Sequence, residues 1–257
     1  MTTPAGTVLA PLAARYASWL ALPADQTNQV ETEPELVRAM PVILRIERDP
    51  APARTPLLEA AAAAAVAVCL DPRAEPEGEW HEPVSAWVAG HIRKVSRRAR
   101  GAHWQAAQGF PGVTVEVDGA SARALVPGLV VETPKEISRL QISGSDLPAD
   151  EPGAVADGVP VLWLNPAVPL TAGKAAAQVG HASMLLAALL DEPDIKTWAG
   201  IGFRCAVRMP TRDQWAALHP GDDPAGAWQN RRVIAVRDAG FTEVTPGTVT
   251  VLAQWRA

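Results

Sequence analysis

The sequence has 257 residues and a formal net charge of −5, with 48% hydrophobic and 20% charged residues. A chain of this length and composition can bury one or two cores, which excludes wholesale disorder. No stretch reaches the roughly 18 apolar residues of a membrane span, and two cysteines are too few for a disulfide framework or a cysteine-rich zinc site. We expect a reduced, cytoplasmic protein without a signal peptide or a broad nucleic-acid-coating surface.

The chain divides into a helical leader, two units and a linker. In the leader, residues 1–40, an amphipathic helix is predicted over residues 9–22, ended by Pro23, with one or two further helical turns at 33–40. The segment 144–158 is acidic, rich in Gly and Pro, and without apolar periodicity, so it is the predicted linker. The two units are therefore residues 41–143 and 159–257.

Strands and helices are predicted to alternate in both units. The first unit opens with a strand at 42–46 and an alanine-rich helix at 56–70. In the second unit, Thr211 and Gln214 have the spacing of a capping box. Its strands are expected near 159–164, 202–208, 232–237 and 248–255, and its helices near 173–190, 193–199 and 211–219. We expect an α/β fold made of two tandem three-layer α/β/α units, each with a four-stranded mixed sheet.

The units share landmarks that indicate a tandem duplication. Trp87 and Trp104 are 17 residues apart (104 − 87), as are Trp198 and Trp215 (215 − 198). The first strands and the Pro-Gly pairs near the end of each unit follow the same order. Repeats of this kind point to two copies of one structural unit. The alternative is two unrelated α/β modules of similar composition. Alanine-rich runs are treated as compositional bias and carry no weight.

Three polar side chains lie along the second unit's long helix, at spacings of four and three residues: Lys174, Gln178 and His181. At about 100° per residue they share one stripe of a helix whose other faces are apolar. A lysine in the first turn is disfavoured by the helix dipole unless an anion binds there. The alternative is a solvent-facing polar stripe with a hydrogen-bonded histidine.

A second cluster of polar residues begins where the predicted strand 232–237 ends. Asp238 opens an Asp-Ala-Gly turn, and a Pro-Gly turn precedes the last strand. Asp238 could cap the turn, or it could act in a site, because loops at strand ends often carry functional groups.

Together, GKAAAQVGHA at 173–182 and DAGFTEVTPGTVTVLA at 238–253 resemble the peptidyl-tRNA hydrolase 2 family over residues 159–257. The resemblance implies a four-stranded mixed sheet flanked by helices, and hydrolysis of the ester between a peptide and the terminal ribose of tRNA. Family members are typically homodimers of single domains. Two such units in one chain could therefore form an intramolecular pseudo-dimer, and the chain would be a monomer or a weak homodimer. Residues 41–143 would be a degenerate copy, because they lack the polar residues.

Carried over by position, the resemblance implies active-site roles for Lys174, His181, Asp238, Thr242 and Thr248, and substrate-binding roles for Gly173 and Gln178 of the helix motif. Arg208, or alternatively Arg204, is expected to lie near the cleft, where Arg208 would bind substrate. A histidine oriented by a carboxylate can deprotonate water, so His181 with Asp238 is the expected pair. Alternatively the water lies on Asp238 and His181 is structural. Lys174 would hold a phosphate or stabilise an oxyanion. This set needs no metal ion or cofactor. We expect these groups around one open, electropositive cleft.

The sequence departs from the family pattern at three places, where charged or polar residues of the family are absent. These places are Thr171-Ala172, Asn165-Pro166-Ala167 and Phe241. The segment 93–100 has five cations, and there Arg93 and Arg97 could contact the tRNA backbone or line a solvated sheet edge. The expected partner is the 3′ end of peptidyl-tRNA, with no membrane. The alternative function is a non-catalytic tRNA- or protein-binding module on the same fold.

Overall fold

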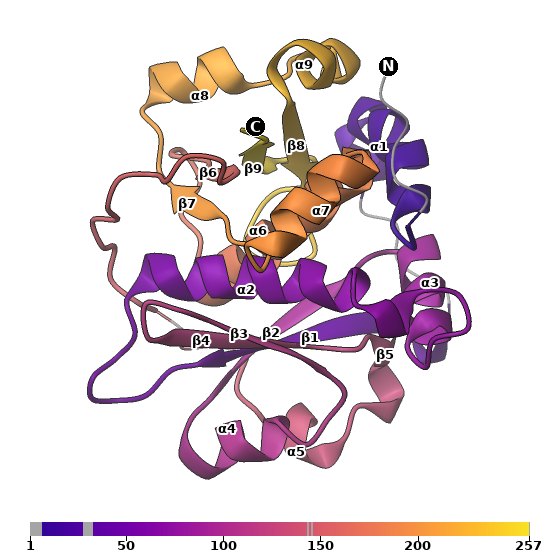
Figure 1. Cartoon of the computed structure of the whole chain (residues 1–257), viewed down its shortest axis with the longest axis vertical. Coiled ribbons are helices and arrows are strands. Elements are labelled where there is room, and N and C mark those ends of the chain that lie inside the picture. Colours follow the sequence, from indigo (N-terminus) through magenta and orange to yellow (C-terminus); the bar gives the residue numbers. More distant parts are fainter. Residues whose placement is uncertain (1–6, 28–32, 143, 145, 257) are drawn as a thin grey trace.

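The fold consists of two mixed β-sheets with helices between them and on their outer faces (Figure 1). It was obtained as a computed structural model that describes residues 7–27, 33–142, 144 and 146–256. The predicted α/β class with two mixed sheets is confirmed. Within the described residues, no helix is long and apolar enough to cross a membrane.

The two sheets have the same strand order. The first sheet runs β2-β1-β4-β3, with the short β5 also paired to β1, and the second runs β7-β6-β9-β8. In each sheet the first two strands of the path are parallel and the remaining pairs are antiparallel. The bounds are β1 Arg38–Arg45, β2 Lys94–Ala99, β3 Gly112–Val117, β4 Ala120–Leu125, β5 Gly128–Leu129, β6 Val161–Leu164, β7 Ala206–Arg208, β8 Val233–Arg237 and β9 Val249–Gln254.

The first three helices of each unit stand in the same order between the strands: α2, α3 and α4 in the first unit, and α6, α7 and α8 in the second. The capping box of Thr211 and Gln214 forms as predicted, whereas α9 was not expected. The bounds are α1 Ala10–Ala21, α2 Arg54–Cys69, α3 His81–Ala89, α4 Gly101–Ala107, α5 Lys135–Ser138, α6 Ala172–Leu189, α7 Glu192–Gly200, α8 Arg212–Leu218 and α9 Pro224–Arg231.

Two buried tryptophans occupy matching places in the units. Trp87 in α3 and Trp198 in α7 are both fully buried. Each indole N–H donates to the carbonyl oxygen six residues later, Arg93 at 3.0 Å and Arg204 at 2.7 Å. The units thus share topology and one detailed contact. Because unrelated chains can share a fold, the duplication itself stays a prediction.

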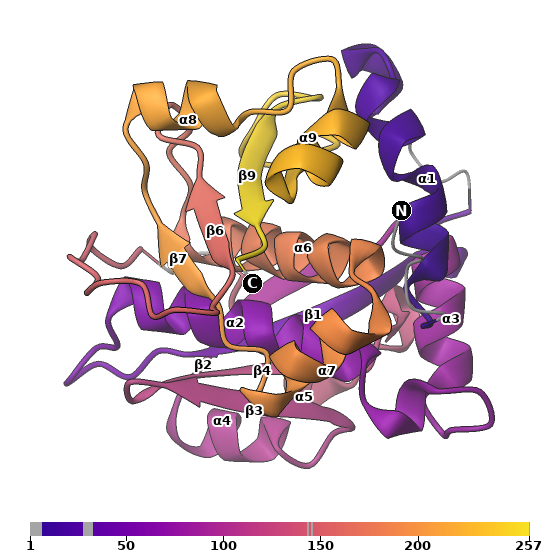
Figure 2. The same cartoon turned by 45° about the horizontal axis from the view of Figure 1, so that its top comes forward.

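Helices α2 and α6 lie side by side between the sheets (Figure 2). The alanines at 60–65 of α2 are all fully buried, so this run takes part in the packing although it was given no weight as a signal. The helices approach closely: Ser183 Oγ donates to the Ala62 carbonyl oxygen at 2.7 Å. A methyl group added to Gly180 would lie 3.2 Å from the Ala65 Cβ. Small side chains therefore set the distance between the two units.

The linker predicted at 144–158 contains neither helix nor strand in its described residues. It nevertheless contacts both units. The Asp150 carboxylate accepts from the Thr55 backbone N–H at 2.9 Å and so caps the first turn of α2. The Gly153 carbonyl oxygen accepts from Arg208, beside β7.

The leader contains the predicted helix, as α1, and this helix bridges the two units. Arg15 donates to the carbonyl oxygens of Val88 and Gly90 at the end of α3, both at 2.7 Å. The Tyr16 hydroxyl accepts from the Ala235 N–H in the edge strand β8, also at 2.7 Å. The helical turns expected at 33–40 are only partly present, because just Pro34–Leu36 is helical and β1 begins at Arg38, which pairs with β5.

Tyr16, the single tyrosine of the sequence, should titrate abnormally. Its burial raises the pKa of the phenol from 10.0 to about 12. The folded state keeps the proton that the unfolded state loses, so this contribution to stability is complete below pH 10 and disappears between pH 10 and about 12. At about pH 11, near-ultraviolet absorbance should show tyrosinate in unfolded protein and little in native protein. Equal midpoints in the two states would contradict the buried position of Tyr16.

Candidate active site

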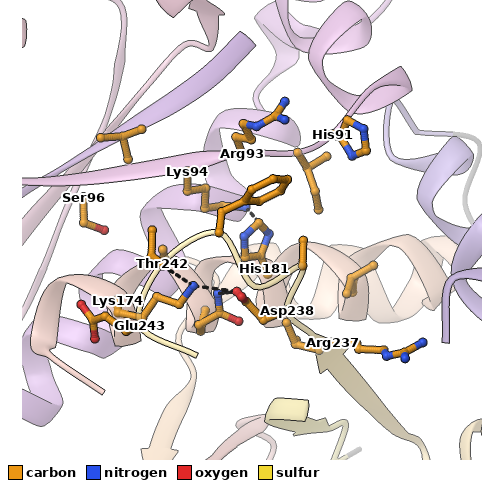
Figure 3. A pocket seen from close by; sticks show the side chains of 18 of the residues that line it. His91, Arg93, Lys94, Ser96, Lys174, His181, Arg237, Asp238, Thr242 and Glu243 are labelled. Atoms are coloured by element: carbon orange, nitrogen blue, oxygen red, sulfur yellow. Dashed lines mark hydrogen bonds and ion pairs between the residues drawn. The ribbon is translucent and has the colours of Figure 1, made fainter. Parts of the chain in front are cut away.

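A pocket of about 460 Å³ lies between the two units (Figure 3). Its walls come from α1, α6, the start of β2 and the loop that follows β8. Both units and the leader thus contribute to one cavity.

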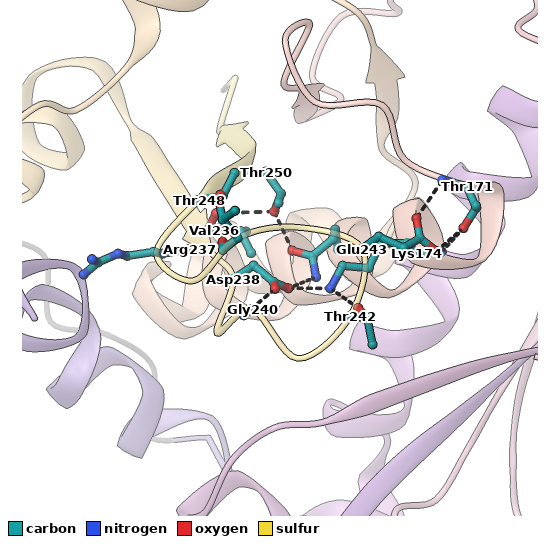
Figure 4. A network of polar contacts seen from close by, with 12 residues as sticks. Thr171, Lys174, Val236, Arg237, Asp238, Gly240, Thr242, Glu243, Thr248 and Thr250 are labelled. Carbon is teal, nitrogen blue, oxygen red and sulfur yellow. Dashed lines mark hydrogen bonds and ion pairs between the residues drawn. The ribbon is translucent and has the colours of Figure 1, made fainter. Parts of the chain in front are cut away.

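A lysine, an aspartate and a threonine meet at the pocket wall. Lys174 Nζ lies 2.7 Å from Asp238 Oδ2 and 2.9 Å from Thr242 Oγ1. The lysine and aspartate side chains are only 11% and 9% exposed, so the ion pair is recessed and weakly screened. Figure 4 shows Lys174 beside Asp238 and Thr242. Gln178 also donates to Asp238 Oδ2, at 2.7 Å. The three side chains expected to share a stripe of α6, Lys174, Gln178 and His181, all line the pocket.

The loop after β8 fixes the position of Asp238. The Asp238 N–H donates to the Thr248 carbonyl oxygen at 2.8 Å, and its Oδ1 accepts from the Gly240 N–H at 2.8 Å. Gly240 has φ 83°, and a Cβ there would lie 2.5 Å from Pro246, so this turn requires glycine. On the other side, buried Thr250 donates to Gln178 Oε1 and orients the amide that holds the carboxylate.

The start of α6 is capped by the Thr171 hydroxyl, and a carboxylate of the same chain holds Thr171 in place. Thr171 Oγ1 accepts from the Lys174 N–H at 3.1 Å, and Glu243 accepts from the Thr171 N–H at 3.0 Å and from its hydroxyl at 2.7 Å. Two carboxylates of the chain thus lie near this helix start, Glu243 on Thr171 and Asp238 beside Lys174. Glu243 was not predicted as a site residue, although it follows Thr242 directly.

His181 is paired differently from the expectation. Its Nδ1 lies 3.1 Å from Lys94 Nζ, and no hydrogen bond joins it to Asp238 in the part of the chain that the structure describes. Burial, together with the charges of Lys94 and Lys174, lowers the pKa of the imidazole well below its usual value. The ring is therefore neutral near pH 7 and oriented by the lysine, not by the aspartate.

Lys94 was not predicted as a site residue. Burial lowers the pKa of its ammonium group to about 7, and the ammonium group lies 5.0 Å from the centre of the Trp87 ring. Strand alternation was the available signal, since it places Lys94 and Ser96 on one face and Arg97 on the other. Which face meets α6 depends on how the two units pack, and that was not readable from the sequence.

The remaining predicted site residues take no part in the contact between Lys174 and Asp238. Thr248 Oγ1 donates to the Thr245 carbonyl oxygen at 2.8 Å. Arg208 pairs with Glu59 of α2 at 2.9 Å, and Arg97 donates to the carbonyl oxygens of Ser138 and Leu140 at 2.8 Å. These three lie outside the pocket, because nearer acceptors satisfy their donors. Gly173 and Arg93 do line it, with the Arg93 guanidinium 5.3 Å from the centre of the Phe241 ring.

The pocket combines a fixed cation, a carboxylate with several donors, and a hydroxyl. Such a set can position water and stabilise negative charge that develops on an oxygen. Among the described residues, no group of three or more His, Cys, Asp or Glu side chains is arranged to hold a metal ion.

The architecture and the site define a two-unit α/β protein with a polar centre in its second unit. The sequence model of the family described as Peptidyl-tRNA hydrolase PTH2 matches residues 159–254. The second unit is thus similar to that family, and the match lies wholly outside the first unit. No curated protein and no solved structure matches the chain.

Proposed function

We propose that the protein hydrolyses the ester bond between the peptide and the tRNA of peptidyl-tRNA. The observation that carries this proposal is the contact of Lys174 with both Asp238 and Thr242 in a pocket of the unit that matches the family. A fold alone would not support an activity, whereas a polar centre with this geometry does.

In the proposed reaction, Asp238 binds the attacking water and accepts its proton while the water oxygen bonds to the ester carbonyl carbon. Lys174 and the Thr242 hydroxyl donate to the carbonyl oxygen, which becomes negatively charged in the tetrahedral intermediate. The bond to the ribose oxygen then breaks, and the proton held by Asp238 passes to that oxygen. We assign water activation to Asp238 alone, because His181 contacts Lys94 and not the carboxylate.

The first unit is proposed to complete the site, so that the chain works as an intramolecular pseudo-dimer. Its β2 lies against α6, and β7 of the second unit lies against α2 in return. At Phe241, where the family usually has a basic residue, Arg93 of the first unit brings a guanidinium to the ring. A single chain would then bind the 3′ end of its substrate.

The test is hydrolysis of an N-acetyl-aminoacyl-tRNA by the wild type and by Lys174→Met. Loss of a donor to the developing oxyanion should lower the rate by about 10²–10³-fold. Lys196→Met is the matched control, because Lys196 is an exposed lysine that pairs with Glu192 on α7.

Two results would contradict the proposal. Tight binding of the substrate by the wild type without hydrolysis would indicate a non-catalytic tRNA-binding module. Equal rates for Lys174→Met and wild type would remove Lys174 from the reaction.

A further inference from the structure

Strand β2 of the first unit presents two hydrogen-bond donors to the pocket, Lys94 and Ser96. Among the described residues, the Lys94 ammonium group has a single hydrogen-bond contact, with His181, although it carries three N–H bonds. The Ser96 hydroxyl is buried and has no hydrogen-bond partner in the described chain. Buried hydroxyls without a partner are uncommon and costly, so an acceptor from a ligand is expected here.

Arg93, Arg15 and Arg237 also line this side of the pocket, and each already has a contact. The Arg93 guanidinium lies against the Phe241 ring, and the other two are engaged by backbone carbonyl groups. Arg15 binds the end of α3, and Arg237 donates to the carbonyl oxygens of Leu20 at 3.1 Å and Gly247 at 3.2 Å. A phosphate bound beside Lys94 would therefore have to compete with these existing contacts for a second cation. Apolar side chains complete these walls: Leu12, Trp19, Ile92 and Leu185. The surroundings suit a largely apolar group that carries uncharged acceptors.

We propose that Lys94 and Ser96 form the subsite for the peptidyl part of the substrate, where they donate to amide carbonyl oxygens while the apolar walls contact an amino-acid side chain. The inference rests on the proposed function, since it names the part of peptidyl-tRNA that enters this end of the pocket. It gives the first unit a direct part in substrate binding.

Lys94 is held in place at this end of the pocket and can donate to an uncharged acceptor. The Lys94 amine donates hydrogen bonds in both its neutral and its protonated forms. The lysine stem is also confined by α6, because a Cβ added to Gly180 would lie 3.1 Å from Lys94 Cε. Lys94 thus holds a fixed place at one end of the pocket.

The experiment compares two small ligands that carry separate parts of the substrate. N-Acetylphenylalaninamide has amide carbonyls and an apolar side chain, and 5′-AMP has a phosphate and a base. Binding of each is measured by NMR titration to the wild type, Lys94→Met, Ser96→Ala and Lys135→Met. Lys135 is the matched control, because it is an exposed lysine of the first unit on α5, outside the pocket.

The expected result is a loss of amide affinity of about 5- to 10-fold in Lys94→Met and in Ser96→Ala, with AMP binding unchanged. Ser96→Ala removes one oxygen atom that has no hydrogen-bond partner among the described residues, so the variant should fold normally. With N-acetyl-phenylalanyl-tRNA, Lys94→Met should raise KM and change kcat little.

The inference is overturned if the wild type does not bind the amide, or if both variants bind it with the affinity of the wild type. It is also overturned if Lys94→Met lowers the affinity for AMP. Amide binding does not require hydrolysis. A protein that binds the amide through Lys94 but hydrolyses no peptidyl-tRNA would therefore refute the proposed activity and keep the subsite.

Discussion

Replacing Asp238 by asparagine is expected to slow peptidyl-tRNA hydrolysis by about 10²–10⁴-fold, the usual contribution of a general base. The amide cannot accept a proton from water, and it leaves Lys174 without its ion-pair partner. Single-turnover hydrolysis under saturating enzyme is the appropriate measurement, because it separates the chemical step from product release.

Asp222→Asn is the control for this change, since Asp222 is an exposed aspartate near α9 and outside the pocket. Thermal unfolding of both variants would show whether the loss of rate reflects the reaction or the fold. A native-like Asp238→Asn protein that hydrolyses at the wild-type rate would refute the role given to this carboxylate.

Trp198→Ala should destabilise the protein by about 3–5 kcal/mol, as truncation of a buried tryptophan does. The indole is fully buried, donates to the Arg204 carbonyl oxygen, and lies 5.7 Å from the rings of both Phe203 and Trp255. Trp87→Ala should cost a similar amount, because Trp87 makes the corresponding contact in the first unit.

Urea unfolding monitored by circular dichroism measures both changes. One large cluster of buried apolar residues, which includes Trp87 and Trp198, spans both units, so each variant should unfold in a single transition at lower urea concentration. A cost below about 1 kcal/mol for Trp198→Ala, or separate unfolding of the two units, would contradict this description of the core.

Much of the second unit was readable from periodicity and turn residues. The predicted helix at 173–190 is α6, Ala172–Leu189, and the last strand predicted near 248–255 is β9, Val249–Gln254. Helix α9 was missed, although its start has a recognisable signal: Asp223 caps the Gly226 N–H and is followed by proline. Helix α9 is short and has few apolar residues, so no helical periodicity of apolar residues could be recognised.

The site residues could be predicted only where they lie in neighbouring segments of one unit. Lys174, Asp238 and Thr242 belong to two segments of one unit, and the structure brings them together. Lys94 reaches His181 from a strand 87 residues earlier, so its role depends on the packing of α2 against α6. The alanines that permit this packing were attributed to compositional bias. In a sequence where alanine is abundant, the alanines needed for close helix packing cannot be told from the others.

The alanine face of α2 also affects the entropy of the folded state. Alanine loses no rotamer freedom when it is buried, whereas a leucine or methionine at the same contact would lose some. Close backbone approach leaves few alternative packings of α6 on α2, so the polar side chains of α6 start from a single, preset position. Substrate binding should then require little reorganisation of the protein, and the ordering cost of association falls mainly on the flexible end of the tRNA.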